Sequence, residues 1–268
     1  MYRHIMKRNR INSIYNFIEQ HQSVNTLDLV EKFKVSGMTI RRDLATLEAM
    51  GKIVRFHGGA HANRNNKQED DFNLRIKYKS DLKMAIGKRA VKHLSEEILP
   101  TKPSTIYIGS GSTVLCMAKQ IDPSVDVQLI TDNLHVANHL ASITNTPLIM
   151  IGGAIMPSSL MVTGYIAEKY LGELAIDCTF IGSSAIDKGG SLCGYNLMEA
   201  GVFSSLIKIS KHVVVLTDHT KLGVQNLVHI STLNEHFTLI TDDQADQELL
   251  NHYKSLGTKV LIAKTDNY

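Results

Sequence analysis

The chain has 268 residues, of which 43% are hydrophobic and 21% are charged, and its formal net charge is +3 at pH 7. This length allows one large domain or two ordinary ones with a sizeable core, and the composition excludes wholesale disorder. No apolar run approaches the roughly 20 residues that span a bilayer, and no signal-peptide apolar block follows the basic N-terminus. We therefore expect a cytoplasmic protein without a membrane partner.

The basic residues are concentrated in the first quarter of the chain. Residues 1–64 hold 11 Lys and Arg against 5 Asp and Glu, whereas residues 65–268 hold 18 against 21. A charge asymmetry of this kind predicts that one end of the protein binds a polyanion.

The first 50 residues have the pattern of three short helices. Ile11, Ile14 and Ile18 recur at helical spacing and make one apolar face. Asn25 is followed three residues later by Asp28, which predicts the start of a second helix. Ser36 is a good N-cap for a third helix that ends near Gly51. Because so few residues separate the second and third helices, they must cross steeply.

After Gly51 the pattern changes to alternation with a Gly58-Gly59 turn, which predicts a β-ribbon. The next stretch is polar and aperiodic, so we predict a first domain over 1–60, a linker over 61–79 and a second domain over 80–268.

The second domain alternates strands and helices, which indicates a mainly parallel α/β sheet. The predicted strands are 104–109, 126–131, 147–153, 178–184, 212–218, 236–241 and 259–263. The predicted helices are 112–121, 132–144, 164–175, 196–209 and 244–256.

The third helix separates two kinds of side chain. Ile40 and Leu44 point to one side, whereas Thr39, Arg41 and Arg42 occupy flanking and opposite positions near its N-terminal end. Two arginines on a helix are ordinarily just solvated. The short turn before this helix, the ribbon and the local excess of basic residues instead favour a winged helix-turn-helix that contacts phosphates and base edges.

These residues resemble the signature of the DeoR family of bacterial transcriptional regulators. The matching positions are Val35, Ser36, Thr39 to Leu44, Leu47-Glu48, Gly51, Arg55 and His57 to Ala60. The resemblance implies that operator double-stranded DNA is a partner. The implied contacts are Ser36, Thr39, Arg41 and Arg42 in the major groove and Arg55 and His57 on the wing.

A second set of residues falls at the ends of predicted strands, where open α/β sheets bind ligands. The loop Ser110, Gly111, Ser112 and Thr113 has the small residues and hydroxyls that suit an anion, although tight strand-helix turns need glycine anyway. Lys221 also follows a strand. It is either a counter-charge for a phosphoryl group or a lysine in a solvated turn.

The resemblance extends over this region, because the family's sensor domain is similar in fold to ribose-5-phosphate isomerase. It implies a phosphorylated sugar as effector and a homo-oligomer. Together with the strand-end positions, it gives the candidate effector-binding residues Ser110, Gly111, Ser112, Thr113, Asp132, Gly152, Gly153, Asn196, Glu199 and Lys221. The chain departs from the family at Gly109 and Phe203, where an acidic residue and a lysine are usual, and at Asp132-Asn133, where Asn-Ser is usual. We infer an unusual effector specificity.

Metal and cofactor signals are weak. Cys116, Cys178 and Cys193 are widely separated, so we expect reduced, buried thiols. His135 and His139 have a metal-ligand spacing, but the sequence indicates no third ligand. We expect neither a metal nor a cofactor.

The sequence therefore predicts a non-enzymatic regulator, a repressor of a carbohydrate-utilisation operon. The alternative is a sugar-phosphate isomerase-like enzyme with an appended DNA-binding module, which needs a carboxylate base such as Glu199 or Asp218.

Overall fold

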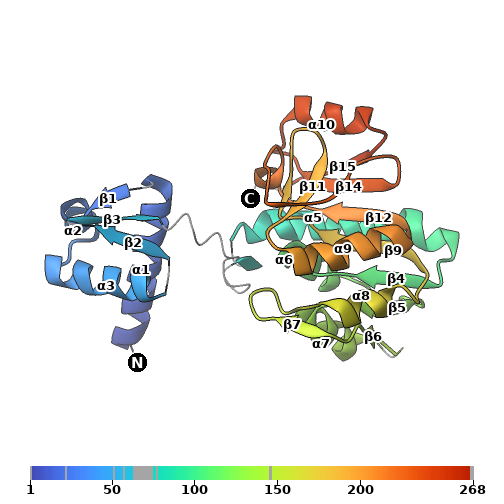
Figure 1. Ribbon diagram of the computed structural model, residues 1–268, viewed down its shortest axis with the longest axis horizontal. Helices are drawn as coiled ribbons and strands as arrows, with labels where there is room; N and C mark the ends of the chain where they lie inside the picture. The colour runs from blue at the N-terminus through green and yellow to red at the C-terminus, as the bar shows by residue number, and fades with distance from the viewer. Residues whose placement is uncertain are drawn as a thin grey trace. The chain divides into compact units, whose positions relative to one another are not determined.

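The computed structural model divides into two compact units, Met1–Gln68 and Glu69–Tyr268, and each is described by itself (Figure 1). The described residues are 2–21, 23–50, 52–56, 58–62, 75–76, 78–144 and 147–265. Most of the predicted linker, including residues 63–74, lies outside them.

The N-terminal unit consists of three helices and a small antiparallel sheet, as the periodicity predicted, with one strand added. The helices are α1 (Tyr2–His21), α2 (Thr26–Phe33) and α3 (Gly37–Ala49). The strands are β1 (Ser23–Asn25), β2 (Ile53–Phe56) and β3 (Gly59–Ala62), in the order β1-β3-β2. The three-residue β1 is too short for alternation to reveal, and its pairing with β3 is long-range.

The core of this unit contains the apolar positions that the helical spacing selected. Ile40 and Leu44 are 0% and 1% exposed and pack with Ile14, Ile18 and other apolar side chains from α1, α2 and β2. The apolar face of α3 is therefore directed inward, which leaves its other side for solvent or a partner.

An ion pair ties α1 to α3. Arg10 Nε lies 2.7 Å from Asp43 Oδ2, and Arg10 Nη2 lies 3.3 Å from Oδ1. The Asp43 side chain is 1% exposed, whereas that of Arg10 is 25% exposed. Asp43 therefore belongs to the interior, although it sits beside two exposed arginines in the sequence.

The C-terminal unit is built on one seven-stranded parallel sheet in the order β15-β14-β12-β9-β4-β5-β6. Its strands are β4 (Thr105–Ile108), β5 (Gln128–Thr131), β6 (Ile149–Met150), β9 (Ile176–Gly182), β12 (Ser210–Leu216), β14 (Phe237–Asp242) and β15 (Lys259–Ala263). Each corresponds to a predicted strand, and the mainly parallel α/β class is confirmed.

Helices cover both faces of the sheet (Figure 1). The helices are α5 (Ser80–His93), α6 (Ser112–Ala118), α7 (Leu134–Ile143), α8 (Tyr165–Leu171), α9 (Leu197–Ile209) and α10 (Gln247–Ser255). Successive residues of β4 enter different cores: Ile106 and Ile108 pack with α5, α6 and α7, whereas Tyr107 packs with α8 and α9. Because strand side chains alternate, a sheet buried on both faces needs continuous apolar strands.

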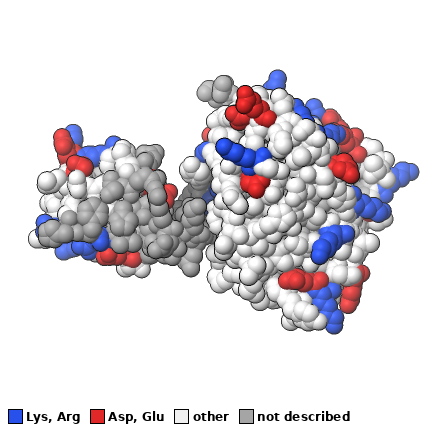
Figure 2. All heavy atoms as spheres, turned by 45° about the horizontal axis from the view of Figure 1, so that its top comes forward, with Lys and Arg blue, Asp and Glu red and all other residues white. Residues whose placement is uncertain are grey.

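Two small antiparallel sheets accompany the main one. One is the hairpin of β7 (Ala154–Met156) and β8 (Met161–Thr163); the other joins β10 (Ala185–Ile186), β11 (Ser191–Gly194) and β13 (Val228–Thr232). Charged side chains are sparse over a broad central area of the face of this unit shown in Figure 2.

We predict that Asp43→Asn lowers the free energy of unfolding of the N-terminal unit by about 1–3 kcal/mol, because it removes the negative charge that pairs with the partly buried Arg10 guanidinium. Hydrogen-deuterium exchange of peptides from residues 2–62 measures this loss. Glu48→Gln is the matched control, because Glu48 lies on the same helix but is 44% exposed. Equal exchange rates in the two variants would contradict the prediction that the Arg10–Asp43 pair contributes to the stability of this unit.

Candidate functional site

The start of α3 is held by the two predicted DNA-contacting hydroxyls. Ser36 is the N-cap, and its Oγ accepts the backbone N–H of Thr39 at 3.3 Å. The two hydroxyl oxygens are 2.9 Å apart. These bonds fix the first turn of the helix, which in a helix-turn-helix approaches the base edges.

Arg41 and Arg42 are exposed, and no ion pair joins either of them to another described residue. The first turn of α3 contains no acidic residue. Two unpaired guanidinium groups therefore lie near the positive end of the helix dipole, an arrangement that attracts phosphate.

The predicted wing residue Arg55 has a partner within the protein. Its Nη1 lies 3.4 Å from Glu48 Oε2, and its backbone N–H donates to Glu48 Oε1 at 3.3 Å. These contacts join β2 to α3. The side chain of Arg55 is 38% exposed. His57, the other predicted wing contact, lies outside the described residues.

In the C-terminal unit, the order β12-β9-β4-β5 brings four loops to one edge of the sheet. The loop after β4 passes against the end of β9: Ser110 O accepts the N–H of Gly182 at 3.2 Å. Gly111 has a φ of 135°, and a Cβ there would lie 3.3 Å from Gly182 Cα. Ser112 and Thr113 follow as nearly buried residues at the start of α6.

The amide of Asn133, one residue beyond the predicted Asp132, links this loop to the rest of the site. Asn133 Nδ2 donates to Ser110 Oγ at 3.0 Å and to Ser159 O at 2.9 Å. Its Oδ1 accepts the N–H of His135 at 3.0 Å and so caps α7. Asn133 is fully buried, so one side chain serves both as a helix cap and as the bridge between two loops.

Glu199 is held from two directions. Ser159 Oγ donates to Glu199 Oε1 at 2.6 Å, and Asn196 caps α9 by accepting the N–H of Glu199 at 2.9 Å. Ser159 lies in the turn between β7 and β8, next to Leu160, whose φ is 52°. A branched residue in the left-handed region costs about 1–2 kcal/mol, and such strain concentrates at functional sites.

Asp132 is a buried acid at the end of β5. It is 0% exposed, and neither of its carboxyl oxygens has a hydrogen bond of normal geometry to a described residue. Burial raises the pKa of Asp132 to about 7. The nearby Tyr107 hydroxyl lowers this pKa, whereas the negative charge of Glu199 raises it further. The Tyr107 hydroxyl is equally buried without such a bond. Unpaired buried polar atoms at strand ends indicate a place for ligand hydroxyls.

Lys83 of α5 is a site residue that the sequence patterns did not reveal. It is 5% exposed, and burial lowers its pKa to about 8, against the opposing effect of Asp218. The charges of Lys221 and Arg75 also lower the pKa, so these cations lie near it. The Lys83 ammonium donates to Arg75 O, and Arg75 Nη2 donates to Ser158 O at 3.3 Å. The local sequence pattern does not distinguish a buried lysine on an amphipathic helix from a solvent-exposed one.

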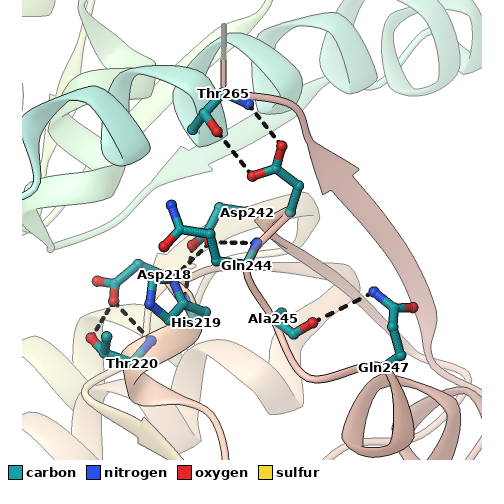
Figure 3. A network of polar contacts seen from close by, with 9 residues as sticks. Asp218, His219, Thr220, Asp242, Gln244, Ala245, Gln247 and Thr265 are labelled. Atoms are coloured by element: carbon teal, nitrogen blue, oxygen red, sulfur yellow. Dashed lines mark hydrogen bonds and ion pairs between the residues drawn. The ribbon is translucent and has the colours of Figure 1, made fainter. Parts of the chain in front are cut away.

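The turn that carries Lys221 is fixed by a network of carboxylates (Figure 3). Asp218 Oδ1 accepts the N–H of Thr220 at 3.1 Å. The backbone N–H of His219 donates to Asp242 Oδ2 at 2.8 Å, and the ring Nδ1 lies 2.7 Å from Asp242 Oδ1. Asp242 comes from the neighbouring strand β14, so Lys221 sits on a rigid support.

Gly152 and Gly153 lie where β6 leads into the β7–β8 hairpin. A Cβ on Gly153 would approach Thr163 O to 2.8 Å, whereas one on Gly152 would meet nothing within 4 Å. Close packing of the hairpin accounts for Gly153 without a ligand.

Comparison with known proteins matches both units to family models. Residues 10–66 match the DeoR-like helix-turn-helix domain, and residues 79–243 match the DeoR C terminal sensor domain. The HTH-type transcriptional regulator GolR of Listeria innocua is 29% identical, over 95% of this chain and 98% of that protein. The glycerol-3-phosphate regulon repressor of Escherichia coli is 28% identical, over 87% and 90%.

Among solved structures, ribose 5 phosphate isomerase A of Neisseria gonorrhoeae aligns with 54% of this chain and 54% of its own, at 16% identity and a TM-score of 0.36. Among the described helices, none has the length and apolar character needed to cross a membrane.

We predict that Asp132→Asn raises the melting temperature more at pH 8 than at pH 5. The folded protein keeps the Asp132 proton up to about pH 7, whereas the unfolded chain releases it near the ordinary value of 3.8. Stability is therefore lost as pH rises between these values, and the neutral asparagine removes that loss. Thermal melts at both pH values measure it, with the exposed Asp126→Asn as control. An equal change at both pH values would refute the assigned protonation.

Proposed function

Because the chain belongs to the DeoR family of transcriptional regulators, we propose that it represses a carbohydrate-utilisation operon by binding operator DNA through α3. We further propose that a phosphorylated sugar at the carboxyl edge of the seven-stranded sheet controls this binding. The observation that carries the effector proposal is the nearly buried ammonium of Lys83 beside Lys221.

The N-terminal unit supports the DNA-binding role through its division of surfaces. Ile40 and Leu44 anchor α3 in the core, and Arg41 and Arg42 are left exposed on its other sides. Arginine bonds bidentately to guanine or to phosphate. A DNA partner agrees with the expected cytoplasmic location and with the excess of basic residues in 1–64.

The C-terminal unit offers separate places for a phosphate and for hydroxyls. Lys83 and Lys221 supply two positive charges, and the carboxylate that acts on Lys83 is that of Asp218. Burying a cation is costly unless a counter-charge completes the site, and a phosphate dianion meets that need. Asp132 and Glu199 supply acceptors for sugar hydroxyls elsewhere along the same edge.

The name of one relative agrees with this effector class, because the repressor of Escherichia coli reported above is named for the glycerol-3-phosphate regulon. We carry over the chemistry of a small phosphorylated carbohydrate, the repressor sign and a homo-oligomeric state as parts of the proposal.

The enzyme alternative has less support. The relatives reported above are named as regulators, and Glu199, one of the two carboxylates nominated as the base, already accepts a 2.6 Å hydrogen bond from Ser159 Oγ. Assays with aldose and ketose phosphates should show no isomerase turnover, and turnover at ordinary enzymatic rates would overturn the regulator proposal.

We predict that Arg42→Ala weakens binding to an operator selected from random duplexes and reduces the slope of log K against log salt by about one unit. Fluorescence anisotropy from 50 to 300 mM salt measures both effects. Lys52→Ala, on the same unit but outside α3, is the control. If Arg42→Ala leaves affinity unchanged at every salt concentration, the proposed contact does not exist.

We predict that Lys83→Met and Lys221→Ala leave operator affinity unchanged but reduce the affinity for a phosphorylated sugar at least 10-fold, because each removes a cation from the phosphate site. A thermal-shift screen of phosphorylated sugars identifies the probe, and release of labelled operator measures the response. Lys211→Ala is the control: its side chain is 77% exposed and lies at the opposite end of β12 from Lys221. Normal release by both site variants would eliminate the phosphate site.

A further inference from the structure

The carboxyl edge of the seven-stranded sheet has a cationic end and an acidic end. The turn that carries Lys221 follows β12, whereas Asp132 follows β5, and the strands β9 and β4 lie between them (Figure 1). The positive charge of Lys221 acts on Lys83. The charge that acts on Asp132 is instead the negative one of Glu199. A ligand that spans this edge therefore meets cations at one end and carboxyl groups at the other.

Three oxygen atoms are buried together at the acidic end of this edge. Strand β4 pairs with β5 so that Tyr107 lies opposite Ile130, and Asp132 follows two residues later on the same face of the sheet. The side chains of Tyr107 and Asp132 are both 0% exposed. Neither the two carboxyl oxygens nor the hydroxyl oxygen has a hydrogen bond of normal geometry to a described residue. Because buried polar atoms are rarely left unsatisfied, these three oxygens indicate a ligand.

The part of the chain that the structure describes supplies no counter-charge to Asp132. None of the ion pairs there involves its carboxyl group. Glu199, which accepts the hydroxyl of Ser159, is a second acid nearby, and its negative charge opposes the ionisation of Asp132. Burying one carboxylate near another is costly unless a cation accompanies them. A cationic group on the ligand would relieve this cost, whereas a neutral group would not.

The number of hydrogen-bond donors also favours an ammonium group over a hydroxyl group. A hydroxyl has one hydrogen to donate, whereas an ammonium group has three and accepts none. The carboxyl group of Asp132 and the hydroxyl group of Tyr107 together offer three oxygen acceptors. One ammonium group can therefore satisfy all three, and a single hydroxyl cannot.

We propose that the effector is a phosphorylated amino sugar whose ammonium group binds Asp132 and Tyr107. Its phosphate group binds at the other end of the edge, beside Lys83 and Lys221. Such a ligand is positive where the site is acidic and negative where the site is cationic. The inference rests on the proposed function, because it takes the phosphate site of that proposal as one end of the ligand.

The test compares matched pairs of sugars by calorimetric titration of the full chain. The probes are the 6-phosphates of glucosamine, galactosamine and mannosamine, each paired with the 6-phosphate of the hydroxyl sugar of the same configuration. In at least one pair we expect the amino member to bind tighter by about 10-fold or more, because a hydroxyl leaves buried acceptors unpaired. The N-acetylated form of that amino sugar phosphate, whose nitrogen is uncharged, should lose this advantage.

Variants test whether the preference comes from the acidic end. Asp132→Asn should reduce the ratio of the two dissociation constants to about one, because the amide carries no negative charge and presents two donors of its own. Tyr107→Phe removes one acceptor and should reduce the ratio by about 3-fold or more. Asp126→Asn, at an exposed carboxyl group before β5, is the control and should keep the wild-type ratio. Melting curves establish that each variant is folded.

Equal or tighter binding of the hydroxyl member in all three pairs would overturn the inference. So would folded Asp132→Asn and Tyr107→Phe variants that keep the wild-type preference. If the hydroxyl member then releases operator, the proposed function stands without the ammonium site. An unphosphorylated amino sugar that binds as tightly as its 6-phosphate, and loses affinity in Asp132→Asn, would instead refute the phosphate site of the proposed function and leave the ammonium site intact.

Discussion

The parallel pairing of β4 with both β5 and β9 is the constraint on which the C-terminal unit depends. It aligns the carboxyl ends of three strands, so Ser110, Asp132 and Gly182 meet at one edge although more than seventy residues separate the first from the last. Asn133 then joins the first two loops to the β7–β8 turn through two hydrogen bonds. The site is thus a consequence of strand order, completed by one buried amide.

The charges at this edge of the sheet lower the stability of the folded protein, and the proposed effector site rests on them. A nearly buried lysine and a fully buried aspartate both cost free energy, because the protein interior solvates charge poorly. Lys83 keeps its backbone partner at Arg75, whereas Asp132 has no hydrogen bond of normal geometry to a described residue. Natural proteins retain such groups where a ligand compensates for them.

The first turn of α9 shows how one segment serves two surfaces. Helical geometry directs residues three positions apart to the same side and their neighbours elsewhere. Asn196 Oδ1 accepts the backbone N–H of Glu199 as the N-cap of this helix, while the side chain of Leu197 is 77% exposed. The first turn of α9 therefore carries both a predicted effector-binding residue and an exposed apolar side chain.

The sequence by itself determined the three N-terminal helices, the seven strands of the main sheet and the character of each unit, but not β1, α5 or the two small antiparallel sheets of the C-terminal unit. Apolar spacing in α3, the Ser36 cap and the continuous apolar strands are local properties, and each matches the structure. The resemblance to the DeoR family, carried by Thr39 to Leu44, also depends on local residues and is confirmed by the family models.

Only the tertiary structure decided which polar residues are interior and what they meet. Asp43 follows two exposed arginines, yet α1 buries it against Arg10. Lys83 has the pattern of a solvated helical lysine, yet the ends of other elements surround it with charge. In each case the deciding contact joins residues far apart in the chain, and such contacts leave no periodic signal in a single sequence.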